Sequence, residues 1–157
     1  FAFYSEWNDR SSEVLLNCDN EVQEICGALS DLNTVGVASL KDHYEIMGVA
    51  GCVSDIERMT TKIKSLKFLK DQAPMVKKGK GYVPDLKSRY FQEDFVFGLY
   101  LISNIGNIVG GETKQMNQIM QWYSALMGED SLEQAKKALP QTYGIVSKQQ
   151  LTQFYLQ

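Results

Sequence analysis

The strongest constraint on the fold is an apolar segment at about residues 94 to 109. Apolar side chains occupy nearly every position of a helix built from it, and such a helix belongs in the middle of a domain. Gly98 and Gly106 lower its helix propensity, so we expect neighbouring helices to approach closely at both positions. The apolar residues of the segment are Phe95, Val96, Phe97, Leu99, Tyr100, Leu101, Ile102, Ile105, Ile108 and Val109.

Three further segments show helical periodicity. Apolar residues spaced three and four apart predict one helix from about Ser11, one after the capping-box sequence SDIE at 54–57, and one after the glycine pair at 110–111. The second helix is expected to end before Pro74. The residues that carry the periodicity are Val14, Cys18, Val22, Ile25 and Leu29; Ile56, Met59, Ile63 and Leu66; and Met116, Ile119, Met120, Tyr123 and Met127.

Shorter helices are predicted where weaker signals fall. A segment that starts at Ser39 is expected to stop at Gly48, where the sequence GVAG interrupts the chain. Two capping-box patterns near the C-terminal end predict the starts of two more short helices. These pairs are Ser131 with Gln134 and Ser147 with Gln150.

The remaining segments lack strand signals. Residues 74–87 contain two of the three prolines and two glycines, and we predict that they form a loop. No run of β-branched residues alternates between hairpin turns. The sequence therefore predicts an all-α fold, a single helical domain of six to eight helices around a buried central helix. With 157 residues, the chain suits one domain over residues 1–157.

Charge argues against a general nucleic-acid binder. The formal net charge is -3, whereas nucleic-acid-binding domains usually carry a basic surplus. Nine of the sixteen basic residues nevertheless fall between Lys62 and Arg89, opposed only by Asp71 and Asp85. We interpret this region as a solvated helix face followed by the loop KKGKG at 77–81, with a surface that faces an anion or a partner as the alternative.

Cysteine usage and the start of the chain bear on location. Cys18, Cys26 and Cys52 are odd in number and lack CxxC spacing, which argues against a disulfide framework and a zinc site. We therefore expect reduced thiols and a cytoplasmic protein. The apolar segment contains two asparagines and, at ~15 residues, is too short to cross a bilayer, so no membrane is expected. The first residue is Phe1 rather than Met, which suggests a fragment or a processed product.

The clearest chemical signal lies in SRYFQEDFVFGLY at 88–100. Arg89 and Asp94 would point about 140° apart on one continuous α-helix, so we expect them to share a site only if Arg89 precedes the helix. There the helix N-terminus favours an anion, and the guanidinium adds a fork that matches a carboxylate. Glu93 and Asp94 then interact favourably with the positive end of the helix dipole, or they orient a histidine or a substrate amine. The alternative is that Arg89 pairs with Glu93, Asp94 caps the helix, and nothing binds.

Other candidate residues are weaker. His43, the only histidine, has no constellation of partners and is interpreted as structural rather than catalytic. No nucleophile elbow, zinc-protease or P-loop motif is present, and GVAGCV at 48–53 lacks the spacing and the preceding strand of a dinucleotide loop. The sequence therefore predicts no metal site and no cofactor cradle. The aromatic start FAFYSEW is interpreted as core packing, with an interface strip as the alternative.

The motif RYFQEDFVFGL at 89–99 resembles the C-terminal helical domain of the octopine/nopaline dehydrogenase (opine dehydrogenase) family. The flanking sequences KGKGYVPDLKS and ISNIGNIVGGET add to the resemblance. FYSEW near the start, SLKDHYEIMGVAG in the middle, and the sequence from Gln118 through Gly128 and Asp130 follow in the order that the family shows. The resemblance covers most of the chain, and only the motif at 88–98 is specific.

The resemblance implies a fold and a reaction. The fold is a helical domain of the 6-phosphogluconate dehydrogenase C-terminal type, preceded by a Rossmann domain, with substrate in the cleft between them. The reaction is an NAD- or NADP-dependent reductive condensation of an amino acid with an α-keto acid, with no cofactor bound by this chain alone. Arg89 takes the place of the arginine associated with the substrate carboxylate, and Asp94 that of the aspartate that orients a catalytic histidine. Tyr90 and Glu93 are expected to line the site.

Two departures from the family pattern stand out. Val96 occupies the place of a proline that usually follows the acidic pair, which leaves a shift of the helix start by one turn open. The family's catalytic histidine precedes the region that begins at Phe1, so His43 does not inherit its role and we expect these 157 residues to be inactive alone. A homodimer stays open. Two alternative functions are a helical interaction module that uses the lysines of 62–80 or the apolar start, and the helical half of another two-domain dehydrogenase.

Overall fold

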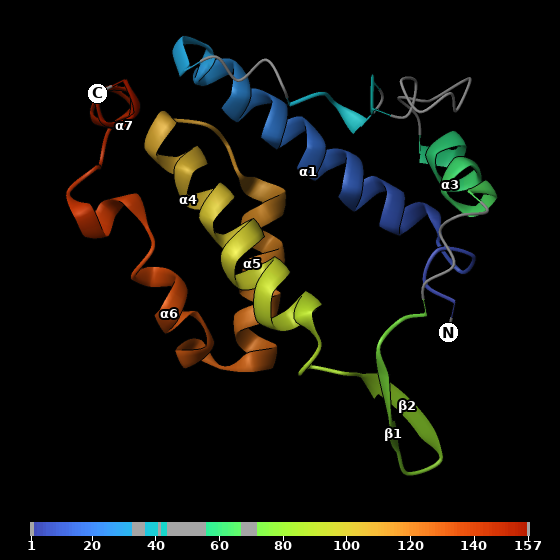
Figure 1. Ribbon diagram of the computed structural model, residues 1–157. Coiled ribbons are helices and arrows are strands. Elements are labelled where there is room, and N and C mark those ends of the chain that lie inside the picture. The colour runs from blue at the N-terminus through green and yellow to red at the C-terminus, as the bar shows by residue number, and fades with distance from the viewer. Residues whose placement is uncertain (1, 33–36, 41, 44–55, 67–71, 157) are drawn as a thin grey trace. The chain divides into compact units, whose positions relative to one another are not determined.

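The computed structural model describes residues 2–32, 37–40, 42–43, 56–66 and 72–156 (Figure 1). It confirms the predicted helical fold. The chain divides into two compact units, of which the first comprises Phe1–Asn17 and Ala38–Ser88 and the second Cys18–Val37 and Arg89–Gln157. The elements are α1 (Asp9–Ala28), η1 (Ser30–Leu32), α3 (Ile56–Ser65), β1 (Met75–Lys78), β2 (Gly81–Pro84), η2 (Tyr90–Leu99), α4 (Tyr100–Val109), α5 (Lys114–Met127), η3 (Glu129–Leu132), α6 (Glu133–Lys136), η4 (Pro140–Tyr143) and α7 (Lys148–Tyr155).

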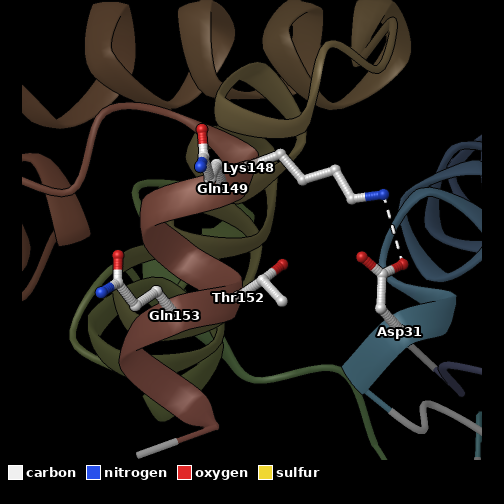
Figure 2. Close-up of a pocket in the computed structure, with 5 residues that line it drawn as sticks. All are labelled: Asp31, Lys148, Gln149, Thr152 and Gln153. Atoms are coloured by element: carbon white, nitrogen blue, oxygen red, sulfur yellow. Dashed lines mark hydrogen bonds and ion pairs between the residues drawn. The ribbon is translucent and has the colours of Figure 1, made fainter.

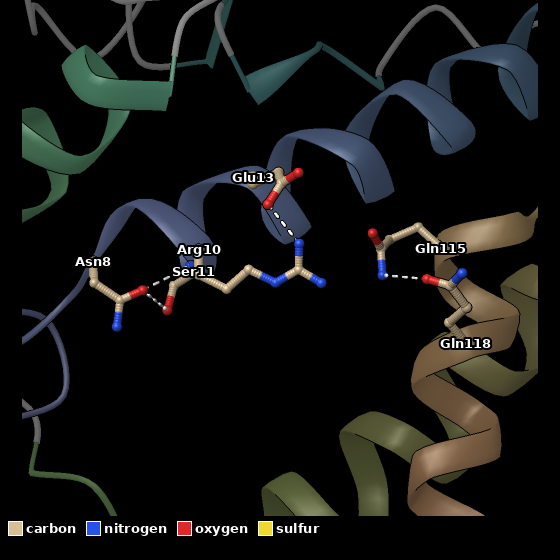
Figure 3. Close-up of polar contacts among 6 residues, drawn as sticks. All are labelled: Asn8, Arg10, Ser11, Glu13, Gln115 and Gln118. Atoms are coloured by element: carbon tan, nitrogen blue, oxygen red, sulfur yellow. Dashed lines mark hydrogen bonds and ion pairs between the residues drawn. The ribbon is translucent and has the colours of Figure 1, made fainter.

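The start of α1 is fixed by a local cap in the first unit. The Asn8 side chain accepts a hydrogen bond of 3.0 Å from the Ser11 amide (Figure 3), which satisfies one of the amides that lack a partner at a helix start. One turn later the buried Ser12 hydroxyl accepts from the Trp7 indole at 2.9 Å and lies 2.7 Å from the Thr60 hydroxyl of α3. These bonds tie α1 to α3.

Helix α3 confirms the helix predicted after residue 54. Its apolar positions Met59 and Ile63 are buried, as is Leu66 just beyond its end. The capping-box residues at 54–55 lie outside the described residues. So does most of the segment predicted from Ser39, of which residues 40, 42 and 43 are helical and the Asp42 amide donates to the Ser39 hydroxyl at 3.1 Å.

Residues 74–87 contain a β-hairpin, so the predicted loop was wrong over most of its length. Strands β1 and β2 pair antiparallel, with Met75 opposite Pro84 and Lys78 opposite Gly81. The two-residue connection begins with Gly79 at φ +61°, the left-handed backbone that such hairpin turns require at this position. Strand periodicity could not reveal the hairpin because β2 is exposed on both faces, and alternation arises only when one face is buried.

The core of the second unit joins α1 to α4 and α7. Ile25, Leu29 and Leu151 are buried together at its centre. Half-buried side chains pack around them: Leu32, Ile105, Ile108, Val109 and Ile145. Helix α5 contributes Met116, Met120 and Tyr123, all buried, which confirms the helical face predicted after the glycine pair.

Gly106 is required where α4 meets the rest of this core. A Cβ atom at Gly106 would lie 2.9 Å from Ile25 Cδ1 and still closer to the methyl group of Thr113, so the close approach predicted here is confirmed. Nothing lies within 4 Å of a Cβ built at Gly98, and the same prediction was wrong there. Gly110 ends α4 in a left-handed conformation with φ +79°, as the glycine pair predicted.

The capping-box predictions near the C-terminal end had different outcomes. Ser147 caps α7, because its hydroxyl accepts from the Gln150 amide and the Gln150 side chain accepts from the Val146 amide at 2.9 Å. Ser131 instead donates to the Gly128 carbonyl at 2.6 Å inside η3, and α6 starts two residues later without a side-chain cap. The capping-box pattern therefore predicted the start of α7 correctly and misplaced the start of α6.

The apolar segment forms one continuous helix from η2 into α4. Phe91, Val96, Ser103 and Gly106 are buried along it, whereas Phe97 is 48% exposed. Among the described residues, no helix is both long and apolar enough to cross a membrane.

Candidate functional site

The four predicted site residues come together at the start of this helix, in the second unit. Tyr90, Glu93 and Asp94 belong to η2, and Arg89 immediately precedes it with helical backbone angles of φ -56° and ψ -31°. Arg89 is thus continuous with the helix. Arg89 therefore lies just before η2, as expected for a shared site, but its backbone is helical and does not form a distinct turn.

The reason is that η2 is a π-helix rather than an α-helix. The Tyr100 amide at its end donates to the Phe95 carbonyl, five residues earlier. In a π-helix each side chain lies beside those of the fourth and fifth residues that follow it. The expected angle of about 140° between Arg89 and Asp94 assumed α-helical spacing. The wider turn therefore brings Arg89 beside both acids of the motif.

Arg89 contacts both carboxylates. Its Nη2 lies 3.4 Å from Asp94 Oδ1, and its Nε lies 4.0 Å from Glu93 Oε2. The side chains remain open to solvent, with exposed fractions of 71% for Arg89, 64% for Glu93 and 46% for Asp94. Exposed pairs of this kind contribute about 1 kcal/mol or less to stability, so they leave the guanidinium available to another anion.

This exposure bears on the alternatives left open by the sequence. One of them, the alternative without a ligand, predicted the Arg89–Glu93 pair. The structure contains that pair but exposes all three charged side chains. Tyr90 is half-buried beside them.

An aromatic cluster anchors the opposite face of η2. Phe91 and Phe95 stack with ring centroids 5.5 Å apart, and both contact Trp122 of α5 at about 6 Å. The Tyr123 ring stacks on Phe95 at 5.1 Å, and its hydroxyl donates to the Phe91 carbonyl at 2.7 Å. The sequence predicted Tyr123 only as a core position, and its place in a helical apolar repeat gave no signal of this bond.

A carboxylate from another helix caps α5. The Glu21 side chain accepts from the amides of Gln115 and Met116, the latter at 3.0 Å. A carboxylate at this position satisfies amides that lack helical partners and complements the helix dipole. Glu21 was not singled out from the sequence, because only the fold brings α1 to the start of α5.

A second group of polar residues lines an open hollow between η1 and α7 (Figure 2). Lys148 and Thr152 point from α7 toward Asp31, and the Lys148 ammonium lies 3.3 Å from the Asp31 carboxylate. A backbone hydrogen bond and then Lys148 lower the pKa of Asp31. Lys148 and Asp31, the two charged residues of this hollow, therefore pair with one another.

The remaining sequence candidates lie elsewhere. His43 is exposed and belongs to the first unit, and the hairpin exposes Lys77, Lys78 and Lys80. Cys18 is a free thiol, and its pKa is raised to about 11, first by burial and then by the charge of Glu21. Across the described part of the chain, no group of histidine, cysteine and carboxylate side chains could hold a metal ion.

Residues 1–127 match the family model described as NAD/NADP octopine/nopaline dehydrogenase, alpha-helical domain. The chain belongs to this family. Among curated proteins it is similar to tauropine dehydrogenase from Arabella iricolor, with 28% identity over 156 residues. That alignment covers 90% of this chain and 39% of the relative, so the chain spans about two fifths of the length of the relative that it matches.

Solved structures of octopine dehydrogenase share the fold of this family member. A complex with NADH and L-arginine matches with a TM-score of 0.67 and 21% identity over 92% of this chain and 39% of the solved chain. A complex with NADH and pyruvate matches with a TM-score of 0.68 and 18% identity over 96% of this chain and 39% of the solved chain. The predicted relation to the helical domain of opine dehydrogenases is confirmed.

Proposed function

We propose that this chain is the substrate-binding helical domain of an NAD- or NADP-dependent opine dehydrogenase. The enzyme would condense the amine of an amino acid with an α-keto acid and reduce the product. The observation that carries this proposal is the exposed Arg89 guanidinium beside two carboxylates, on the motif that resembles the family's substrate site. Octopine dehydrogenase, whose complexes include pyruvate and L-arginine, shares the fold.

The roles of the site residues follow from their chemistry. Arg89 would bind the carboxylate of the keto acid, since a guanidinium offers two parallel donors to a carboxylate. Asp94 would orient a histidine that another part of the enzyme supplies and would stabilise its protonated form. Glu93 and Tyr90 would line the site, with Glu93 close enough to attract a substrate amine.

The cofactor and the remaining partners belong to the complete enzyme. NAD(P)H, when bound, supplies the hydride that reduces the condensation product. The strands that the structure describes form a hairpin whose turn leads to another strand, not to the helix start that holds a dinucleotide pyrophosphate. We therefore assign no cofactor contact to the described residues and propose a Rossmann domain as the partner. A cytoplasmic location agrees with the free thiol of Cys18, and a homodimer stays a proposal.

The experiment that tests this function is steady-state oxidation of NAD(P)H by the complete enzyme, this domain joined to its dinucleotide-binding domain. Arg89→Ala should raise the KM for the keto acid roughly 10- to 100-fold, because a hydrogen bond to a charged group contributes about 1.5–3 kcal/mol. Arg10→Ala is the matched control, since Arg10 is equally exposed and pairs with a nearby glutamate. An unchanged KM in the Arg89 variant would remove this residue from the site.

A second variant addresses Asp94. Replacing a carboxylate beside a histidine by an amide lowers the pKa of the histidine, because the protonated form loses its partner. Asp94→Asn should therefore lower kcat and move the alkaline limb of the pH–rate profile of the reductive reaction to lower pH. A profile that keeps its position would show that Asp94 does not face the catalytic histidine.

The interaction module remains the second candidate, and one observation supports it. The hairpin exposes Lys77, Lys78 and Lys80 together with Tyr82, which is 58% exposed. Such a surface fits an acidic partner, and binding through lysines weakens steeply as salt is added. A partner bound with equal affinity at low and high salt would argue against this use of the hairpin.

A further inference from the structure

One side chain attaches the π-helical segment η2 to α5 at two points. The Tyr123 hydroxyl donates a hydrogen bond of 2.7 Å to the Phe91 carbonyl. The Tyr123 ring also stacks on the Phe95 ring, with centroids 5.1 Å apart and planes inclined by 16°. Tyr123 is 1% exposed and therefore well fixed by its surroundings. A single rigid group thus holds two positions of η2 that are four residues apart.

The positions of Phe91 and Phe95 control the helical spacing of the charged residues on the other face of η2. Phe91 and Phe95 are four residues apart, as are Arg89 and Glu93. Both pairs lie in the same turns of the helix. In the π-helix the fifth residue stays beside the first, so Asp94 remains 3.4 Å from Arg89. In an α-helix the fifth residue turns about 140° away. Whatever holds the positions of Phe91 and Phe95 therefore decides whether Asp94 faces Arg89.

The Tyr123 hydroxyl is suited to this task. Burial raises the pKa of Tyr123, so the group stays protonated and donates at neutral pH. A backbone carbonyl has two lone pairs. Phe91 accepts this bond without losing its acceptor capacity within the helix.

We propose that Tyr123 is a positioning residue of the carboxylate-binding site, because it holds η2 in the π-helical register that places Asp94 beside Arg89. The proposal rests on the function proposed above. Tyr123 acts through Phe91 and Phe95 and has no contact with the substrate. π-Helices are rare and frequently occur at functional sites, and the tie to α5 gives this one a structural cause.

The test is the kinetics of Tyr123→Phe in the complete enzyme. This change removes the hydroxyl and keeps the ring. The KM for the keto acid should rise about tenfold, the size expected for the loss of one ordinary hydrogen bond, while the KM for NAD(P)H stays close to that of the parent. The thermal unfolding midpoint should fall by a few degrees in any case, because a buried hydrogen bond is lost, so the keto-acid KM is the deciding measurement. A structural role alone would lower the midpoint and leave the keto-acid KM unchanged. Tyr143→Phe is the matched control, because Tyr143 is 72% exposed.

A double-mutant cycle separates this proposal from the proposed function. In an Arg89→Ala background, Tyr123→Phe should raise the keto-acid KM no further, because the guanidinium beside which it places Asp94 is gone. If Arg89→Ala raises this KM and Tyr123→Phe does not, the positioning role is overturned and the proposed function stands. If Arg89→Ala has no effect, the proposed function fails and the positioning role fails with it.

A second variant covers the case in which Tyr123→Phe does not fold. Phe95 is half-buried, so Phe95→Leu removes the ring contact with a smaller risk to the core and leaves the hydroxyl in place. It should also raise the keto-acid KM while the KM for NAD(P)H is unchanged. An unchanged keto-acid KM in this variant would overturn the proposal in the same way.

Discussion

The two halves of the apolar helix differ in how they are held. The first half, η2, is π-helical and attached to α5 by aromatic rings and one buried hydroxyl, with its charged face open. The second half, α4, is a regular α-helix that packs at backbone distance against Ile25 and Thr113. A regular helix suits close packing, and an irregular one suits a site. One apolar helix can therefore serve both core packing and a candidate site when different neighbouring residues hold its two halves.

The largest expected effect on stability comes from replacing a glycine by alanine in the packed half, compared with the same change in the other half. Gly106→Ala should lower the free energy of unfolding by about 2–3 kcal/mol, because the new Cβ enters the space of Ile25 and Thr113. Gly98→Ala should be neutral or stabilising by up to about 1 kcal/mol, because nothing lies near it and alanine has the higher helix propensity. Urea unfolding measures both. Equal effects would erase the proposed difference between the halves.

A compensating change sharpens the same comparison. Thr113→Ser removes the methyl group nearest to Gly106 and keeps the hydroxyl, which donates to Asn107 at 3.2 Å. Combined with Gly106→Ala it should recover part of the lost stability, and the two changes should be non-additive because the groups are in contact. Combined with Gly98→Ala it should recover nothing.

A smaller effect is expected where α1 caps α5. Glu21→Gln should lower the free energy of unfolding by about 1 kcal/mol, since the charge at the helix N-terminus is lost while one oxygen can still accept. Glu24→Gln on the exposed side of α1 is the control. The keto-acid KM should not change in either variant, because Glu21 supports the packed half. A change in KM would link the cap to the site.

The smallest effect concerns pH and the ion pair beside the core of the packed half. The pKa of Asp31 is lowered below its ordinary 3.8, first by a backbone hydrogen bond and then by Lys148. A lowered folded-state pKa means that this contribution to stability is complete above about pH 4 and is lost as pH falls through the lowered value. Asp31→Asn should therefore flatten the acid side of the stability profile slightly. An unchanged acid limb would show that the pair contributes nothing, as is common for exposed pairs.

Several elements could be predicted because their causes are local. The apolar repeats of α1, α3 and α5 and the cap of Ser147 on α7 each depend on residues within one or a few turns. The candidate residues Arg89, Tyr90, Glu93 and Asp94 could be proposed together because they form one contiguous motif, and their role in a site stays a prediction. The β-hairpin at 74–87 was missed because its strands are exposed, so burial imposed no alternating pattern.

The sequence by itself determined the helical class, the position of the apolar helix and the residues grouped at its start, because periodicity and short motifs are local properties. Only the tertiary structure decided that Gly106 is packed while Gly98 is open, that Glu21 caps a distant helix, and that Arg89 meets Asp94. Those outcomes depend on partners far apart in the chain, 32 residues for Tyr123 and Phe91 and 94 for Glu21 and Gln115. The spacing within a helix does not specify which distant side chain will hold it, and here a buried tyrosine ties down the turn that brings the two charges together.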